Sequence, residues 1–157
     1  MDKIRGFEVC SSFSDINLPK RSTARSAGYD FEAAEDTVVP SVWKMALKGS
    51  ENIKPTFIKT GVKAYMQEDE ALFLYNRSSN PGKKGLVMAN SVGVVDSDYY
   101  NNADNEGHIM FAFYNFFPID VTIKKGERIG QGVFKKFLKA DGDNADAIRT
   151  GGFGSTK

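Results

Sequence analysis

The sequence has a single cysteine, Cys10, and a single histidine, His108. One cysteine excludes a disulfide bond within the chain, and one residue of each kind leaves too few nitrogen and sulfur ligands for a zinc site. His108 has no serine or cysteine partner in a recognisable nucleophile motif, so a Ser-His hydrolase is unsupported.

Excess charge of either sign is also lacking, because 21 Lys and Arg residues are offset by 20 Asp and Glu residues, for a formal net charge of +1. A protein that binds duplex nucleic acid usually has a larger basic excess, so no nucleic-acid partner is expected. No apolar run reaches the ~18 residues of a membrane span, and residues 1–8 do not resemble a signal peptide. The sequence therefore predicts a soluble, cytoplasmic protein with no membrane partner.

Hydrophobic residues make up 41% of the 157 positions, which suits one domain with a real core. The 15 glycines recur in turn-like segments between short apolar runs. Within residues 62–67, 71–75 and 121–124 the pattern tends to a period of two, which indicates strands. Many short strands with regular turns predict an all-β sandwich, barrel or jelly roll.

Two segments add detail to this all-β prediction. Residues 109–114 are apolar throughout, which fits a strand buried on both faces or one buried in a subunit contact. The only helix expected is a short one at residues 41–47, because Pro40 precedes it and Gly49 follows it.

The chain is expected to end in a separate tail. Residues 141–146 (DGDNAD) are polar and acidic with no hydrophobic face. We therefore expect a single β domain over residues 1–140, a polar linker over 141–148 and a C-terminal tail over 149–157.

The tail itself (RTGGFGSTK) combines Arg149 with glycines and hydroxyl residues, which are the parts of a phosphate site. It matches neither a Walker A loop nor a Rossmann fingerprint. A frayed, glycine-rich end is the simpler interpretation, although a disordered spacer has no need of Phe153.

Four further motifs are weak when taken singly. Residues 75–82 form a strand end followed by Arg77, Ser78 and Ser79, which could hold phosphate or form an ordinary polar hairpin turn. In residues 90–100 an apolar strand leads to Asp96, which could orient or deprotonate a water. Asp96 with Asp98 would also suit a divalent cation, or could simply belong to a turn that caps the strand. Residues 26–30 and 125–131, which contain Asp30 and Gln131, resemble structural turns.

The order of these motifs is more informative than any one of them. AGYD (27–30), RSS (77–79), NSVGVVDSDYY (90–100), GERIGQ (126–131) and RTGGFGST (149–156) resemble, in sequence order, the five motifs of the trimeric dUTPases. The resemblance runs from about residue 18 to residue 156. Residues 98–109 resemble the bacteriophage and Gram-positive prophage branch, which implies the bacterial host cytoplasm if the protein is phage-encoded.

The resemblance implies an all-β, jelly-roll-like subunit with one short helix, assembled as a homotrimer with active sites at the subunit interfaces. The reaction would be Mg²⁺-dependent hydrolysis of dUTP to dUMP and pyrophosphate, which keeps uracil out of DNA and supplies dUMP. Asp96 would activate the water that attacks the α-phosphorus. Tyr99 would pack against the deoxyribose and exclude a ribose 2′-hydroxyl, and Asn90 would contact the uracil and help place the water.

The remaining roles implied by the resemblance are contacts to the nucleoside, the phosphates and the metal. Val94, Val95 and the backbone of Met110 would line the nucleoside pocket, and Phe153 would lie over the uracil. The phosphate contacts would come from Arg77, Ser78, Ser79, Gln131, Arg149, Gly154, Ser155 and Thr156. Asp30 would hold waters of the Mg²⁺ shell.

Three alternatives stay open. A dCTP deaminase shares the fold, but Ala112 stands where its catalytic glutamate would be, and alanine cannot move protons. Some phage dUTPases also bind bacterial repressor proteins, and the long segments 41–55 and 101–107 could serve such a partner or the trimer. A purely structural trimer would not explain why five polar motifs occur in this order.

Overall fold

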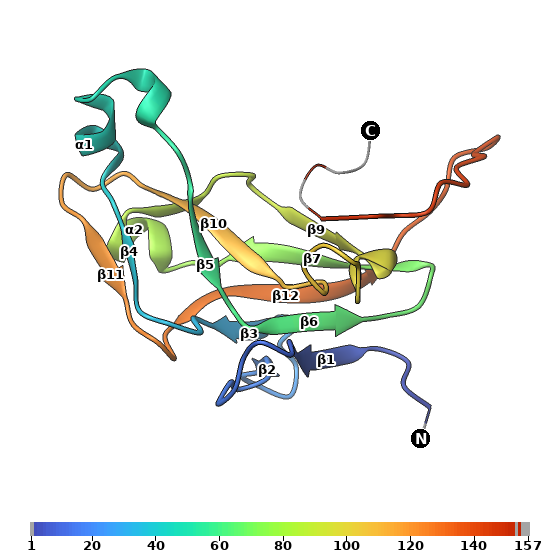
Figure 1. Ribbon diagram of the computed structural model, residues 1–157. Coiled ribbons are helices and arrows are strands. Elements are labelled where there is room, and N and C mark those ends of the chain that lie inside the picture. The colour runs from blue at the N-terminus through green and yellow to red at the C-terminus, as the bar shows by residue number, and fades with distance from the viewer. Residues whose placement is uncertain (1, 153, 155–157) are drawn as a thin grey trace.

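The computed structural model describes residues 2–152 and 154, which form short antiparallel strands joined by turns and a few short helices (Figure 1). In chain order the elements are β1 (Gly6–Val9), β2 (Lys20–Arg21), β3 (Tyr29–Glu32), β4 (Thr37–Val39), α1 (Val42–Ala46), η1 (Ser50–Asn52), β5 (Thr56–Lys59), β6 (Val62–Tyr65), β7 (Glu70–Asn76), α2 (Asn80–Lys84), β8 (Leu86–Met88), β9 (Gly93–Asp96), η2 (Ser97–Tyr99), β10 (Met110–Asn115), β11 (Val121–Ile123) and β12 (Arg128–Lys136). The all-β prediction is confirmed.

The strands form one large sheet and three smaller ones. The five-stranded sheet has the order β2-β3-β12-β7-β9, and the three-stranded sheet has the order β5-β10-β8. Strand β1 pairs with β6, and β11 pairs with β4. The ladders between these described strands are antiparallel, so each sheet can bury one face and leave the other exposed.

Aromatic side chains fill the core between the five-stranded and three-stranded sheets. The rings of Phe31 on β3 and Phe111 on β10 lie 5.5 Å apart, and both residues are fully buried. Strand β12 comes so close to this layer that a Cβ at Gly130 would lie 2.1 Å from Cε1 of Phe111. Glycine at this position therefore allows the two sheets to pack together.

Strand β10 is not buried on both faces within one chain, contrary to one of the two interpretations of residues 109–114. Its residues alternate between a buried side, with Phe111 and Phe113, and a half-buried side, with Met110, Ala112 and Tyr114. Within one chain the apolar strand is thus covered on one face only. Its second, half-buried face is open to a subunit contact.

The expected helix is present, and a second one accompanies it. Ser41 caps α1, because its Oγ accepts a hydrogen bond from the Trp43 backbone nitrogen at 3.2 Å. Helix α2 follows Arg77–Ser79, so the interpretation of this segment as a hairpin turn is wrong: β7 and β8 belong to different sheets. Pro81 in the first turn and Gly85 at the end favour this helix. In the described part of the chain, no helix is long and apolar enough to cross a membrane.

Between residues 137 and 152 the chain has little regular structure. Residues 141–148 are exposed and contain one turn at Asp141–Gly142. In Figure 1 the orange-to-red segment runs out past the sheets and returns toward β9. Gly151 and Gly152 are buried at the end of this return path.

Gly85 provides a test of how α2 is terminated. It has a φ of 64°, and a Cβ there would lie 2.8 Å from the backbone nitrogen of Phe117. We expect Gly85→Ala to lower the free energy of unfolding by at least about 1–2 kcal/mol. The left-handed backbone conformation disfavours any residue with a Cβ, and the new methyl group would clash with the backbone of Phe117. Urea unfolding at fixed protein concentration measures this change.

Gly82→Ala, within the same helix, is the matched control. A Cβ at Gly82 meets nothing within 4 Å, and alanine is favoured over glycine in a helix by about 1 kcal/mol. The control should be as stable as wild type or more so. Equal destabilisation by both substitutions would contradict this account.

Candidate active site

A pocket of about 270 Å³ opens beside β9 and the turn that follows it. It mixes apolar side chains with a carboxylate, an amide and a guanidinium, as small-molecule sites commonly do. Its lining residues are Leu74, Asn90, Gly93, Val94, Val95, Asp96, Tyr99, Ile109, Met110, Arg149 and Gly154. The structure therefore brings together Asn90, Val94, Val95, Asp96, Tyr99, Met110, Arg149 and Gly154 from the predicted site.

Strand β9 presents Asp96 at the pocket. Gly93 and Val95 are buried on one side of the strand, while Val94 and Asp96 are exposed on the other. The 3₁₀ turn η2 begins directly after Asp96, so the chain bends and brings Tyr99 into the same pocket. The Asp96 side chain is 52% exposed, so a water or a ligand can reach its carboxylate.

Arg149 joins the tail to this pocket. Its Nη2 donates to Oδ2 of Asp96, and its Nε donates to Oδ1 of Asp98 at 2.7 Å. The guanidinium lies 5.9 Å from the centre of the Tyr99 ring, and the side chain is only 13% exposed. The two aspartates therefore bind a cationic side chain, and among residues 2–152 and 154 no three His, Cys, Asp or Glu side chains gather as metal ligands do.

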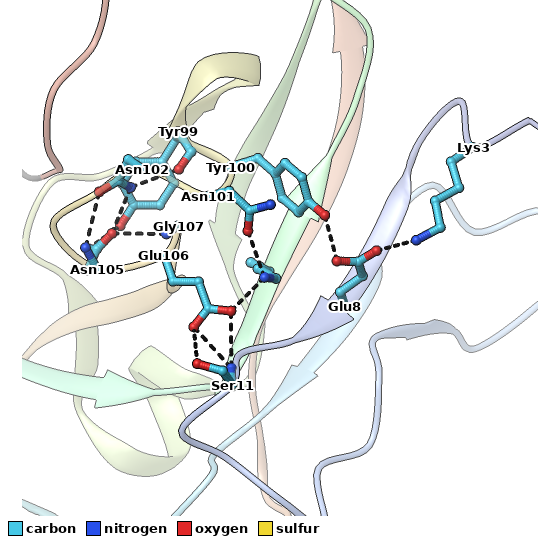
Figure 2. A network of polar contacts seen from close by, with 11 residues as sticks. Lys3, Glu8, Ser11, Tyr99, Tyr100, Asn101, Asn102, Asn105, Glu106 and Gly107 are labelled. Carbon is cyan, nitrogen blue, oxygen red and sulfur yellow. Dashed lines mark hydrogen bonds and ion pairs between the residues drawn. The ribbon is translucent and has the colours of Figure 1, made fainter.

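Tyr99 is buried and hydrogen-bonded through its phenol. Its hydroxyl donates to the backbone oxygen of His108 at 2.8 Å. Nδ2 of Asn105 donates to the phenol oxygen at 2.8 Å (Figure 2). Burial raises the pKa of Tyr99, which keeps the phenol neutral and able to donate. The ring therefore has a fixed place in the pocket wall.

The loop over residues 101–107 surrounds Tyr99 with amide side chains. Nδ2 of Asn102 donates to the backbone oxygen of Tyr99 and to Oδ1 of Asn105, each at 2.8 Å. Asn101, Glu106 and Gly107 all have positive φ angles, of 56°, 64° and 85°. Asparagine tolerates such backbone angles and bonds to its own backbone, which is the signal that could have identified this loop from sequence.

Glu106 fastens the loop to two distant parts of the chain. Its carboxylate accepts hydrogen bonds from the backbone nitrogen and Oγ of Ser11 (Figure 2). It also accepts a hydrogen bond from Nζ of Lys63 at 2.6 Å. Lys63 also donates to Oδ1 of Asn101 at 2.7 Å and is itself buried, although strand alternation places it on the polar face. Sequence patterns did not identify Lys63, Asn105 or Glu106.

A second group of predicted residues gathers elsewhere on the five-stranded sheet. Gln131 pairs with Asp30 across β3 and with Tyr75 across β7, and its Nε2 donates to the backbone oxygen of Asn76 at 3.3 Å. Arg77 follows β7, and its Nη1 donates to the backbone oxygen of Arg128 at 3.2 Å.

The carboxylate of Asp30 completes this second group. It accepts from Ser22 Oγ at 2.6 Å and lies 3.4 Å from Nη1 of Arg128. Ser79 is the residue before α2, and Ser78 is exposed in the turn that precedes it.

The two groups lie at opposite ends of β7. Asp96 pairs with Ala71 near the start of this strand, whereas Arg77 follows its last residue. Extended chain from position 71 to position 77 spans about 20 Å, at about 3.3 Å per residue. Within one chain, then, Asp30, Arg77, Ser78, Ser79 and Gln131 do not line the pocket that contains Asp96. Phe153, Ser155 and Thr156 lie outside the described residues.

The chain is similar to known proteins over most of its length. The family model described as dUTPase matches residues 14–157. The chain is 55% identical to the deoxyuridine 5′-triphosphate nucleotidohydrolase of Lactococcus lactis over 98% of both chains. It is 32% identical to the enzyme of the same name from Albidiferax ferrireducens, over 88% of this chain and 87% of that one. The chain belongs to the dUTPase family.

Solved structures agree with this assignment. The dUTPase from Streptococcus mutans superposes with a TM-score of 0.79 at 49% identity, over 87% of this chain and 99% of that one. This match confirms the jelly-roll-like fold class. The dUTPase of Staphylococcus bacteriophage 80alpha matches with a TM-score of 0.69 at 19% identity, over 94% and 99% of the two chains, which shows a shared fold.

The ion pair between Glu106 and Lys63 leads to a prediction about acid stability. Hydrogen bonds from Lys63 and Ser11 lower the pKa of Glu106 from 4.5 to about 2. A lowered pKa in the folded state stabilises the protein above pH 4.5, and this stabilisation is lost as the pH falls through about 2.

We therefore expect Glu106→Gln to be less stable than wild type above pH 5, with the difference narrowing as the pH falls from 4.5 toward 2. Denaturant unfolding at a series of pH values gives both curves. Parallel curves for wild type and variant across this range would show that Glu106 does not carry the effect.

Proposed function

We propose that this protein is a dUTP diphosphatase that hydrolyses dUTP to dUMP and pyrophosphate, keeping uracil out of DNA and supplying dUMP. The observation that carries the proposal is the reachable carboxylate of Asp96 in a pocket walled by Tyr99 and Arg149. Family membership and the printed names of the relatives support dUTP as the substrate.

Asp96 acts in this proposal on the water that attacks the α-phosphorus. A general base must reach the proton that it accepts, and a half-exposed carboxylate at the pocket satisfies this need. Arg149 holds Asp96 and Asp98 before substrate arrives. A triphosphate offers the guanidinium more negative charge, so substrate binding would move Arg149 to phosphate oxygens and leave Asp96 free to accept a proton.

The apolar side of the pocket would hold the nucleoside. Val94, Val95 and Met110 line it together with Asn90. Asn90 supplies an amide for the uracil, and the Tyr99 ring packs where the sugar would lie. A close-fitting ring leaves no space for a 2′-hydroxyl, which accounts for the preference for a deoxynucleotide.

The phosphate site needs a second copy of the chain. Arg77, Ser78, Ser79 and Gln131 lie at the far end of β7 from Asp96, so another subunit must supply them to this pocket. We infer the homotrimer of the trimeric dUTPases. An apolar surface is available for such a subunit contact. It consists of the half-buried apolar side of β10 and of Val87 on the adjacent β8, which is 40% exposed.

The metal proposed is Mg²⁺, which neutralises phosphate charge when it is bound. Mg²⁺ keeps several waters and binds mainly through phosphates and one or two carboxylates, so it does not require a cluster of protein ligands. Asp30 fits this role, because its carboxylate lies in the same group as Arg77 and Gln131, and its side chain is 21% exposed.

We propose the division of the chain into a β domain (1–140), a linker (141–148) and a closing tail (149–157). The exposed path of residues 141–148 and the placement of Arg149 in the pocket support it. Phe153 would cover the uracil, while Gly154, Ser155 and Thr156 would bind phosphate. A closed tail excludes bulk water from the reaction.

The alternatives have less support. Ala112 lies half-buried on β10 and cannot serve as the catalytic glutamate of a dCTP deaminase. A bacterial repressor as a second partner remains a prediction from the phage-type resemblance, and no contact among the described residues favours it.

Pyrophosphate release from dUTP, dCTP, dTTP and UTP tests the proposed function. We expect rapid release from dUTP alone, and release of ammonia from dCTP would contradict the proposal. Asp96→Asn should lower turnover by about 10²–10⁴-fold, the contribution typical of a general base. Its assembly, measured by light scattering, and its dUTP affinity, measured by calorimetry, should stay close to wild type.

Asp98→Asn is the matched control, because Arg149 contacts Asp98 in the same way. If Asp96 acts as the general base, and its bond to Arg149 is not what activity depends on, Asp98→Asn should retain far more activity than Asp96→Asn. Similar losses in the two variants would remove Asp96 from its catalytic role.

A further inference from the structure

Asn105 lies next to the residue that would select the sugar. Its Nδ2 donates to the phenol oxygen of Tyr99 at 2.8 Å (Figure 2). The Tyr99 hydroxyl in turn donates to the backbone oxygen of His108 at 2.8 Å. The phenol therefore uses both its donor and an acceptor site. For a side chain that is only 8% exposed, these two bonds define where the ring can lie.

The orientation of the Asn105 amide is set by its own partners. Its Oδ1 accepts from Nδ2 of Asn102 at 2.8 Å and from the backbone nitrogen of Gly107 at 3.1 Å. Both partners are donors, so the oxygen must face them and the NH₂ group must face Tyr99. The direction of the bond to the phenol follows from the whole network.

The loop that carries Asn105 is held from outside the pocket. Glu106, the next residue, is bonded to Ser11 and Lys63, which belong to distant parts of the chain. The tail also reaches this place, because a Cβ at the buried Gly152 would lie 3.0 Å from Nδ2 of Asn105 and 3.0 Å from Cε2 of Tyr99. The backbone of the tail therefore lies close to both Asn105 and the ring.

We propose that Asn105 is a positioning residue that fixes the Tyr99 ring and thereby sets the discrimination between deoxyribo- and ribonucleotides. This inference rests on the proposed function, since it concerns how the same pocket reads the sugar. A ring can exclude one hydroxyl group only if it cannot move aside by about the width of that group. Loss of Asn105 leaves the phenol with one of its two described bonds and allows this movement.

The test compares kcat/KM for dUTP with kcat/KM for UTP. Asn105→Ala should lower the dUTP-to-UTP ratio by about five- to tenfold, the effect expected from one neutral hydrogen bond. Asp104→Ala is the matched control, because Asp104 is exposed in the same loop. Its hydrogen bond to Asn102 comes from its backbone nitrogen, which the substitution keeps. This control should keep the wild-type ratio.

A double-mutant cycle separates positioning from a general structural role. If Asn105 acts through the phenol, Asn105→Ala should change the ratio little further in a Tyr99→Phe background. Asn105→Asp keeps the shape of the side chain and removes the donor, so it should also lower the ratio even if the alanine variant folds poorly.

The outcomes are distinct. A wild-type ratio in both Asn105 variants, with dUTP turnover intact, would overturn the inference and leave the proposed function standing. An equal loss of activity on both substrates, together with a lower Tm, would make Asn105 a purely structural residue and would also overturn it. A wild-type protein that does not hydrolyse dUTP would refute the proposed function and the inference with it.

Discussion

The antiparallel register of β7 between β9 and β12 determines where the chemistry can occur. It places Asp96 opposite Ala71 at one end of the strand, and Gln131 opposite Tyr75 near the other end. The backbone hydrogen bonds of two ladders fix both positions. Arg77, which follows the last residue of β7, lies about 20 Å along the strand from Ala71, so side-chain movement cannot close the gap. If Asp96 activates the water and Arg77 and Gln131 bind phosphate, as proposed, the two groups can serve one reaction only when neighbouring subunits bring them together.

The pocket itself depends on polar groups that satisfy one another. Tyr99 is held by Asn105 and the His108 backbone, and burial lowers the pKa of His108, so that its neutral Nε2 can accept the Gly61 backbone N–H at 2.9 Å. Glu106 and Lys63 anchor the same loop. Buried networks of this kind specify one arrangement, because any member left unpaired carries a desolvation cost. The long 101–107 loop thus acquires a role in supporting the site.

Much of this could be predicted from sequence, and the failures have physical causes. Period-two alternation identified β7 and β11, and Asp96 was expected at the end of its strand, because these signals are local. Lys63 was not identified, because its burial depends on Glu106, 43 positions away, which no local pattern reveals. Helix α2 was missed although Pro81 and Gly85 signal it, since a polar turn has a similar composition. The division of the site between two ends of a sheet depends on strand pairing, which is non-local.

Subunit mixing tests the shared site most directly. Asp96→Asn and Arg77→Ala would each impair every site in a trimer of identical chains, but in mixed trimers some pockets combine an intact Asp96 with an intact Arg77 from a neighbour. Co-refolding equal amounts of the two variants should restore about a quarter of wild-type dUTP hydrolysis, the share given by random assortment. A mixture no more active than the two variants measured separately would show that one chain builds the whole site, contrary to this account.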